Sequence, residues 1–211
     1  MTADANSKTY AIIPGPEMGV VSIDYLEKLA QVARMHEIPL VKITSAQRFA
    51  FAGFPADSTE AIRRDMGLET LPGKPVGIHY IQACPGSKWC KFGQQDSLAL
   101  GAQLKKALMA KALPAKTKVG VSGCPMNCCE GFIRDLGIFG KKKGWTLVFG
   151  GNGGGVPRIG EIIAEGLNEA QVMELAEKCL DFYAAHARKK ERSARFMERT
   201  PVETLKAALG C

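Results

Sequence analysis

Four of the seven cysteines in this chain fall into two short loops. The first loop reads Cys84-Pro-Gly-Ser-Lys-Trp-Cys90, and the second reads Cys124-Pro-Met-Asn-Cys128. Two pairs of thiolates at these spacings could bind a zinc ion or an iron–sulfur cluster. The first pair is wide for zinc, whose paired ligands are usually separated by about two to four residues. A cubane cluster is larger and accepts unequal spacings, so we favour iron–sulfur, with zinc and unligated thiols as alternatives.

The other three cysteines have simpler interpretations. Cys129 adjoins Cys128, and adjacent residues in a loop rarely both reach one metal centre, so we leave it out of the ligand set as a sulfur neighbour of the site. Cys179 lies on an apolar helical stripe and is expected to be a small buried hydrophobe. Cys211 ends the chain and is expected to be a free thiol.

Each cysteine loop follows a predicted strand. The first strand spans residues 76–82 and the second 117–122, and a helix predicted over about 96–111 lies between the two loops. This order can bring four thiolates to one place. Further strands are predicted at 136–139 and 145–149, followed by the glycine run 150–155.

The last third of the chain is predicted to be helical. Asn168 and Gln171 form a capping box for a helix whose apolar stripe includes Cys179. More helix is expected over about 193–209, broken or restarted at Pro201.

The first 70 residues read as short strands alternating with helices. Ser22 can cap a helix, strands are predicted at 40–44 and 48–53, and Asp57 with Glu60 predicts a capping box for a short helix. Arg48 stands beside small residues on its strand, which leaves room for a flat anionic group. A cluster of Pro and Gly near residues 72–75 predicts a domain boundary.

Composition excludes disordered and fibrous classes. Of the 211 residues, 46% are hydrophobic and 23% charged, which is ordinary for a globular chain with a core. Lys and Arg number 28 against 21 Asp and Glu, and this net charge of +7 suits an anionic partner or cofactor. The start of the chain is polar and no run of apolar residues is long enough to cross a membrane, so we expect a cytoplasmic protein without a membrane partner, where cysteines often bind metals.

Nucleic acid is the less favoured anionic partner. Basic residues gather at 141–143 and 188–195, but the second run lacks interleaved aromatic side chains and contains Glu191. We interpret it as a solvated helical face and expect no nucleic-acid binding.

The cysteine loops resemble those of the nitrite and sulfite reductase family, in the domain that binds sirohaem and a [4Fe-4S] cluster. The similar stretches are ACPGSKWCKFGQQDS at 83–97, VSGCPMNC at 121–128, GGNGG at 150–154, and TSAQR at 44–48 followed by Gly53. The resemblance runs over about residues 40–196 and is most specific in the four cysteines. The chain looks most like the short, single-unit sulfite reductases of the assimilatory type.

The resemblance implies an α+β fold with two domains. A small ferredoxin-like domain would occupy residues 1–72, and an α/β domain binding sirohaem and [4Fe-4S], with C-terminal helices, would occupy 73–211. It also implies that Cys84, Cys90, Cys124 and Cys128 bind the cluster and that Cys128 is shared with the sirohaem iron.

The implied activity is the six-electron reduction of sulfite to sulfide. Reduction of nitrite to ammonia, or an iron–sulfur electron-transfer or redox-sensing module without sirohaem, are the alternatives. Because no flavin or second ferredoxin motif is evident, electrons must come from an external, ferredoxin-like carrier. We expect positive charge at the substrate from Arg48, Lys116 and Lys118. The residues expected to contact the cofactor are Arg48, Lys91, Asn127, Cys128, Gly151, Asn152, Gly153 and Arg158.

Two departures from the family pattern matter. Met126 stands where nitrite-reducing relatives often carry Arg. The larger enzymes build their site from two copies of this unit, and this chain contains one. Either a homodimer forms, with Lys116 and Lys118 acting in trans, or a monomer holds a more exposed cofactor. We favour the monomer, because the C-terminal helices could cap the missing side.

Overall fold

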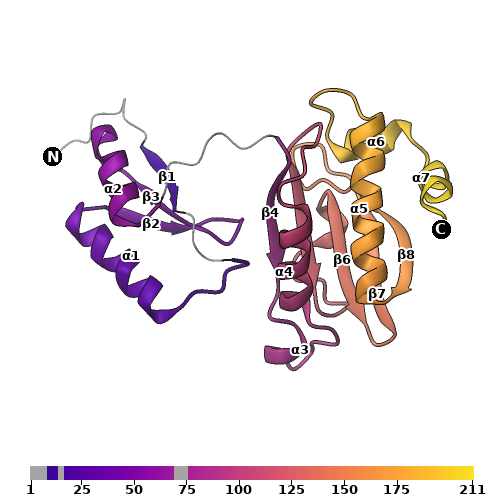
Figure 1. The fold of residues 1–211 in the computed structure, drawn as a ribbon, viewed down its shortest axis with the longest axis horizontal. Helices are drawn as coiled ribbons and strands as arrows, with labels where there is room; N and C mark the ends of the chain where they lie inside the picture. Colours follow the sequence, from indigo (N-terminus) through magenta and orange to yellow (C-terminus); the bar gives the residue numbers. More distant parts are fainter. Residues whose placement is uncertain (1–8, 14–16, 69–75) are drawn as a thin grey trace. The chain divides into compact units, whose positions relative to one another are not determined.

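The computed structural model describes residues 9–13, 17–68 and 76–211, and the chain divides into two compact units, 1–73 and 74–211 (Figure 1). The Pro and Gly cluster predicted to mark the boundary lies outside the described residues. None of the described helices is both long and apolar enough to cross a membrane.

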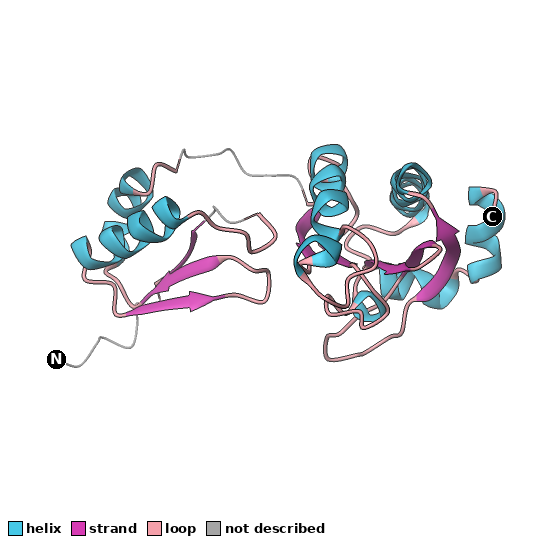
Figure 2. Ribbon diagram, turned by 90° about the horizontal axis from the view of Figure 1, so that it is seen from below, coloured by secondary structure: helices cyan, strands magenta, loops and turns pink. Residues whose placement is uncertain are grey.

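The first unit is a three-stranded antiparallel sheet with helices on one face (Figure 2). The strands lie in the order β1-β3-β2. Phe51 and Ile13 project from the sheet into a core with Leu29, Val32 and Ile62 of the helices. The elements are β1 (Tyr10–Ile13), α1 (Ile23–Met35), β2 (Leu40–Ile43), β3 (Phe49–Ala52), a 3-10 turn (Ala56–Ser58) and α2 (Thr59–Asp65).

Local signals in this unit are partly confirmed. The Ser22 hydroxyl accepts a hydrogen bond from the Tyr25 N–H and caps α1 as predicted. The capping box predicted from Asp57 and Glu60 is wrong, since a 3-10 turn precedes α2 and no side chain caps either element.

The second unit is built on a five-stranded mixed sheet. Its strands lie in the order β4-β5-β6-β7-β8, with β4, β5 and β6 parallel and the β6–β7 and β7–β8 pairs antiparallel. The strands are β4 (Ile78–Ala83), β5 (Thr117–Ser122), β6 (Leu136–Lys141), β7 (Gly144–Phe149) and β8 (Glu161–Leu167). The helices are α3 (Gly86–Trp89), α4 (Ser97–Leu108), a 3-10 turn (Gly131–Ile133), α5 (Glu169–His186), α6 (Ser193–Arg199) and α7 (Val202–Leu209).

The two faces of this sheet are covered differently. Helices α4 and α5 pack against one face, as Figure 1 shows. The segment 129–134 lies against the other face, where β5 and β6 carry glycines. A Cβ at Gly120 would meet the Cys129 carbonyl oxygen at 2.5 Å, and one at Gly137 would meet the Gly131 carbonyl oxygen at 2.1 Å. Glycine at these positions therefore lets the second cysteine loop fold back onto the sheet.

The helical third follows the predicted caps and the predicted extent of helix at 193–209, but not the interpretation given to the basic run before it. Asn168 and Gln171 form the capping box of α5, and Pro201 separates α6 from α7, as predicted. The basic run at 188–195 is not one solvated helical face. Helix α5 ends at His186 and α6 begins at Ser193, and the loop between them is fixed by Arg192 and by Glu191, which accepts hydrogen bonds from Arg199.

Candidate metal centre

The two cysteine loops start at adjacent strand ends. Ala83 of β4 is paired in register with Val121 of β5, and the Cys84 N–H donates to the Val121 carbonyl at 3.1 Å. Cys124 follows β5 by two residues. Because neighbouring parallel strands end at the same edge of a sheet, both loops begin side by side.

Close backbone contacts join the loops to each other. The N–H groups of Gln94 and Gln95 both donate to the Gly123 carbonyl, at 2.8 and 2.9 Å. A Cβ at Gly123 would lie 2.7 Å from the Cα of Gly86, and one at Gly93 would lie 2.4 Å from the Gly86 carbonyl carbon. Because Gly86, Gly93 and Gly123 have no side chain, the backbones of the two loops can lie in direct contact.

Cys84 lies at the centre of these contacts. Its sulfur accepts the Gly123 N–H at 3.1 Å and lies 3.3 Å from the Ser97 hydroxyl. Hydrogen bonds from Cys129, Ser97 and the backbone lower the pKa of Cys84 to about 5, against the opposing effect of burial. This sulfur is therefore prepared to be a thiolate, which is the form that binds a metal.

The four predicted ligands lie near enough to influence one another electrostatically. Burial, and then the charges of Cys84, Cys124 and Cys90, raise the pKa of Cys128, which reflects their proximity. Cys124 is buried, Cys84 and Cys90 are half-buried, and Cys128 is exposed. The residue before Cys128, Asn127, has a left-handed backbone (φ 51°). The side-chain oxygen of Asn127 accepts the Gly131 N–H at 3.0 Å. Asn127 thus shapes the loop that presents Cys128.

The thiols fit a cluster better than a single ion. Among the described residues, no three Cys, His, Asp or Glu side chains are grouped closely enough to bind one metal ion. Tetrahedral zinc with Zn–S of about 2.3 Å needs sulfurs roughly 3.8 Å apart. In a cubane cluster each thiolate binds a different iron atom, so the four sulfurs stand farther apart. Four cysteine thiolates are the donor set of such a cluster.

The other cysteines lie as predicted. Cys179 is fully buried in α5, and Cys211 is exposed at the end of the chain. Cys129 is buried, and its interaction with Cys84, followed by burial, raises the pKa of its thiol, in keeping with the predicted sulfur neighbour of the site.

Large apolar side chains are exposed on the cysteine loops. Trp89 belongs to the first loop, Phe92 follows it by two residues, and Met126 belongs to the second; their exposed fractions are 79%, 60% and 72%. The Lys91 ammonium lies 4.9 Å from the centre of the Phe92 ring. These side chains give the loops an apolar surface with a cation beside it.

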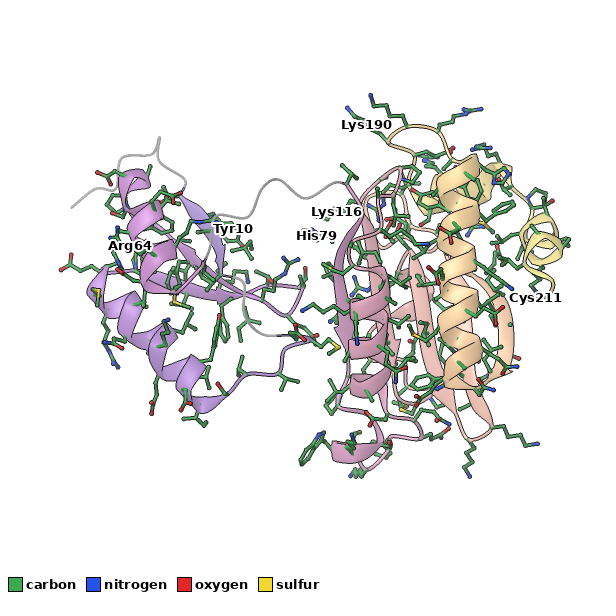
Figure 3. All side chains as sticks on the ribbon, in the orientation of Figure 1. Tyr10, Arg64, His79, Lys116, Lys190 and Cys211 are labelled. Atoms are coloured by element: carbon green, nitrogen blue, oxygen red, sulfur yellow. The ribbon has the colours of Figure 1, made fainter. Side chains whose placement is uncertain are left out.

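The two predicted lysines of β5 differ in their surroundings. Lys116 is exposed directly before the strand, at the end opposite the cysteine loops (Figure 3). Lys118 is half-buried and two residues before Gly120, against which Cys129 lies. Burial, and then the guanidinium groups of Arg192 and Arg134, lower the pKa of Lys118. Only Lys118 is brought near the second loop.

Arg134 is a site residue that the sequence reasoning missed. Its side chain is 11% exposed and donates to the Cys129 carbonyl (3.2 Å), the Tyr80 hydroxyl (2.8 Å), Gln82 Oε1 (3.0 Å) and Glu130 Oε2 (2.6 Å). It thus ties the second cysteine loop to β4.

Asp135, also missed, anchors the C-terminal helices beside the site. Its buried carboxylate accepts hydrogen bonds from the Lys118 N–H, from two nitrogens of Arg192 and from the Ser193 hydroxyl. Adjacent charged residues directly before a buried strand were the available signal for both Arg134 and Asp135.

The glycine turn is held by hydrogen bonds of its own backbone. The N–H of Gly151 donates to the Arg134 carbonyl and that of Asn152 to the Arg158 carbonyl, both at 2.9 Å. These two N–H groups are therefore used within the fold, and the contact of Gly151 and Asn152 with a cofactor stays a prediction. Arg158 likewise donates to the Gly150 carbonyl and pairs with Glu161, so it holds the turn. Gly153 keeps its predicted role as a candidate donor.

Arg48 belongs to the first unit, directly before β3. Its N–H donates to the Thr44 hydroxyl at 3.1 Å, and its side chain is half-buried. Ala50, one of the small neighbours expected to leave room for a flat group, is fully buried.

Comparison with known families identifies both units. Residues 76–210 match the family described as nitrite and sulphite reductase 4Fe-4S domain, and residues 4–68 match the nitrite/sulfite reductase ferredoxin-like half domain. The fold expected from the sequence is thereby confirmed.

Similar proteins agree with these matches. The chain is 40% identical over 201 residues to an assimilatory-type sulfite reductase of Nitratidesulfovibrio vulgaris, covering 95% of this chain and 92% of that protein. It is 34% identical to a nitrite reductase [NAD(P)H] of Bacillus subtilis, again over 95% of this chain, but it spans only 25% of that protein. The crystal structure of dissimilatory sulfite reductase I has the same fold, with a TM-score of 0.78 at 14% identity over 95% of this chain and 68% of that one. The chain therefore belongs to the nitrite and sulfite reductase family of oxidoreductases.

Proposed function

We propose that this chain reduces sulfite to sulfide with six electrons from an external, ferredoxin-like donor, using a [4Fe-4S] cluster and sirohaem. The observation that carries this proposal is the gathering of Cys84, Cys90, Cys124 and Cys128 at two neighbouring strand ends in a domain of the 4Fe-4S type. Similarity to an assimilatory-type sulfite reductase over nearly its whole length supports sulfite as the substrate.

The residues of the two loops suit both cofactors. Cys84, Cys90 and Cys124 would hold the cluster, and the exposed Cys128 would be shared with the sirohaem iron. When bound, the two groups together would supply electrons to the substrate anion. Trp89, Phe92 and Met126 offer apolar surface for its ring, and Lys91 and Gly153 are candidates to bind its carboxylates.

Charge and protons are the chain's own contribution to the reaction. Sulfite loses its three oxygens as water, which takes up six protons along with the six electrons. Lys118 is the candidate acid, because its lowered pKa makes it release a proton more readily than an ordinary lysine. Lys116 and Arg48 are proposed to add positive charge that attracts the anion, and in a homodimer Lys116 and Lys118 would act from the partner.

Nitrite is the second candidate substrate, because relatives of comparable identity are nitrite reductases. The deciding experiment is purification from a host that makes sirohaem, followed by absorption spectra and steady-state assays of both anions with a reduced viologen. We expect a Soret band, a red chlorin band, and a higher kcat/KM for sulfite. A higher kcat/KM for nitrite would reverse the substrate assignment. The absence of a Soret band would refute sirohaem binding and favour the alternative of an iron–sulfur electron-transfer or redox-sensing module.

A further inference from the structure

The turn between β6 and β7 carries two exposed lysines, Lys142 and Lys143, to which the proposed function gives no role. Because Lys141 of β6 is paired in register with Gly144 of β7, these two lysines form the whole tip of the hairpin. Lys141 has an ion-pair partner in Glu165. Neither Lys142 nor Lys143 has one among the residues that the structure describes. The tip of the hairpin therefore carries two uncompensated positive charges.

A cleft of about 510 Å³ opens beside this hairpin tip. Lys142 and Lys143 line it on one side, the end of β8 and the start of α5 line it on the other, and Gln95 also lines it. One carboxylate, that of Glu169, belongs to its wall and accepts a hydrogen bond from the Gln103 amide at 3.2 Å. The hairpin lies at the end of the second unit where α3 of the first cysteine loop also lies (Figure 1). The cleft is therefore basic on the side of the hairpin.

Gln95 connects this cleft to the proposed cluster site. Its side-chain Nε2 donates to the Lys141 carbonyl, and its backbone N–H donates to the Gly123 carbonyl, both at 2.9 Å. The Gly123 N–H in turn donates to the sulfur of Cys84 at 3.1 Å. A Cβ at Gly140 of β6 would lie 2.7 Å from the Gln95 side chain, so the hairpin and the first loop pack in direct contact. The lining of the cleft is thus two hydrogen bonds away from a proposed ligand sulfur.

We propose that the hairpin tip, Lys142 and Lys143, and the cleft beside it are the docking surface of an acidic electron-donor protein. The inference rests on the proposed function, since it takes Cys84 as a cluster ligand and an external carrier as the source of electrons. Such a carrier must bring its own redox centre close to the cluster, and this surface is joined to Cys84 by two hydrogen bonds. The two uncompensated lysines attract carboxylates of the partner and steer its approach.

The test is stopped-flow reduction of the cofactor-loaded protein by an acidic bacterial ferredoxin, itself reduced photochemically, followed by the absorbance of the cluster and sirohaem. The double variant Lys142→Glu/Lys143→Glu is compared with Lys189→Glu/Lys190→Glu, which changes the net charge equally. Lys189 and Lys190 are also exposed, and Lys190 lies at the opposite end of the second unit from the hairpin (Figure 1, Figure 3).

We expect the second-order rate constant at low salt to fall about tenfold or more in the hairpin variant and less than about threefold in the control variant. A wild-type rate in the hairpin variant, as expected if Lys142 and Lys143 bind a nucleic acid or a small anion instead, would overturn the proposal. An equal fall in both variants would also overturn it, because net charge alone would then explain the effect.

Reduced methyl viologen separates docking from damage to the cofactors. Because viologen is a small cation, the new glutamates should leave its rate unchanged or raise it. If its rate falls as well, the wild-type protein decides: oxidised ferredoxin should protect Lys142 and Lys143 from acetylation, measured by mass spectrometry, and should not protect Lys189 and Lys190. Equal acetylation with and without ferredoxin would overturn the proposal. Wild-type protein without iron and acid-labile sulfide would instead refute the proposed function, and this content is measured first.

Discussion

Arg134→Met removes the side chain that ties the second cysteine loop to β4. Methionine keeps the apolar stem and removes all of the guanidinium donors. Three of the lost hydrogen bonds, to Cys129, Tyr80 and Gln82, are worth about 1 kcal/mol each. The pair with Glu130, a side chain that is 56% exposed, is worth about 0.5 kcal/mol. We expect the free energy of unfolding of the second unit to fall by about 3 to 4 kcal/mol.

Tryptophan fluorescence isolates this effect, because both tryptophans, Trp89 and Trp145, lie in the second unit. With a urea m-value of about 1.5 to 2 kcal/mol/M, the unfolding midpoint should fall by about 2 M. Arg195→Met is the matched control, since Arg195 is 60% exposed and pairs only with Glu198 among the ion pairs of the described residues; it should cost less than about 0.5 kcal/mol. A midpoint for Arg134→Met within about 0.3 M of wild type would refute this reasoning.

Three further predictions concern the loops and the C-terminal region. Cys128→Ala should abolish both cluster and sirohaem absorption, whereas Cys179→Ala should leave the spectrum unchanged; equal damage from both would contradict the ligand assignment. Gly93→Ala should strongly reduce the iron content, because the new Cβ would lie 2.4 Å from the Gly86 carbonyl carbon, whereas Gly155→Ala meets nothing within 4 Å and should retain iron. Hydrogen bonding to Arg199 holds the pKa of Glu191 at about 2, below the ordinary value of about 4.3, so its stabilisation is full above about pH 4.3 and is lost as the pH falls toward 2. Glu191→Gln should lower the urea midpoint at neutral pH and converge with wild type near pH 2, and an equal difference at both pH values would count against the assignment.

Local signals predicted the elements best where one residue determines a boundary. The strand predicted at 117–122 has the observed bounds, and the helix predicted from about residue 96 begins at Ser97, where the Asp96 side chain caps it by accepting the Ala99 N–H. Strand β8 was missed because its pairing with β7 shifts register twice and most of its residues are not buried, so strict alternation is absent. Helix α3 was missed because a single turn within the first cysteine loop is too short to show a helical period.

The candidate site was predictable in its cysteines and not in its supports. The number and spacing of the four thiols were enough to predict that they bind a metal centre. Because each loop follows a predicted strand, Cys84 and Cys124 could also be placed at neighbouring strand ends. The contacts of Arg134 and the N–H groups of the glycine turn depend on how the segment 129–134 folds back on the sheet. That packing requires Gly120 and Gly137, because a side chain at either position would collide with the segment 129–134. The sequence does not show which segment packs against these two glycines.

The claim that Cys128 joins the cluster to the sirohaem iron is tested most directly by the Mössbauer spectrum of the ⁵⁷Fe-enriched protein. Shared ligation through one sulfur predicts that the spin of the sirohaem iron produces magnetic splitting at the iron sites of the cluster. Two independent sets of lines, as from separate centres, would contradict it.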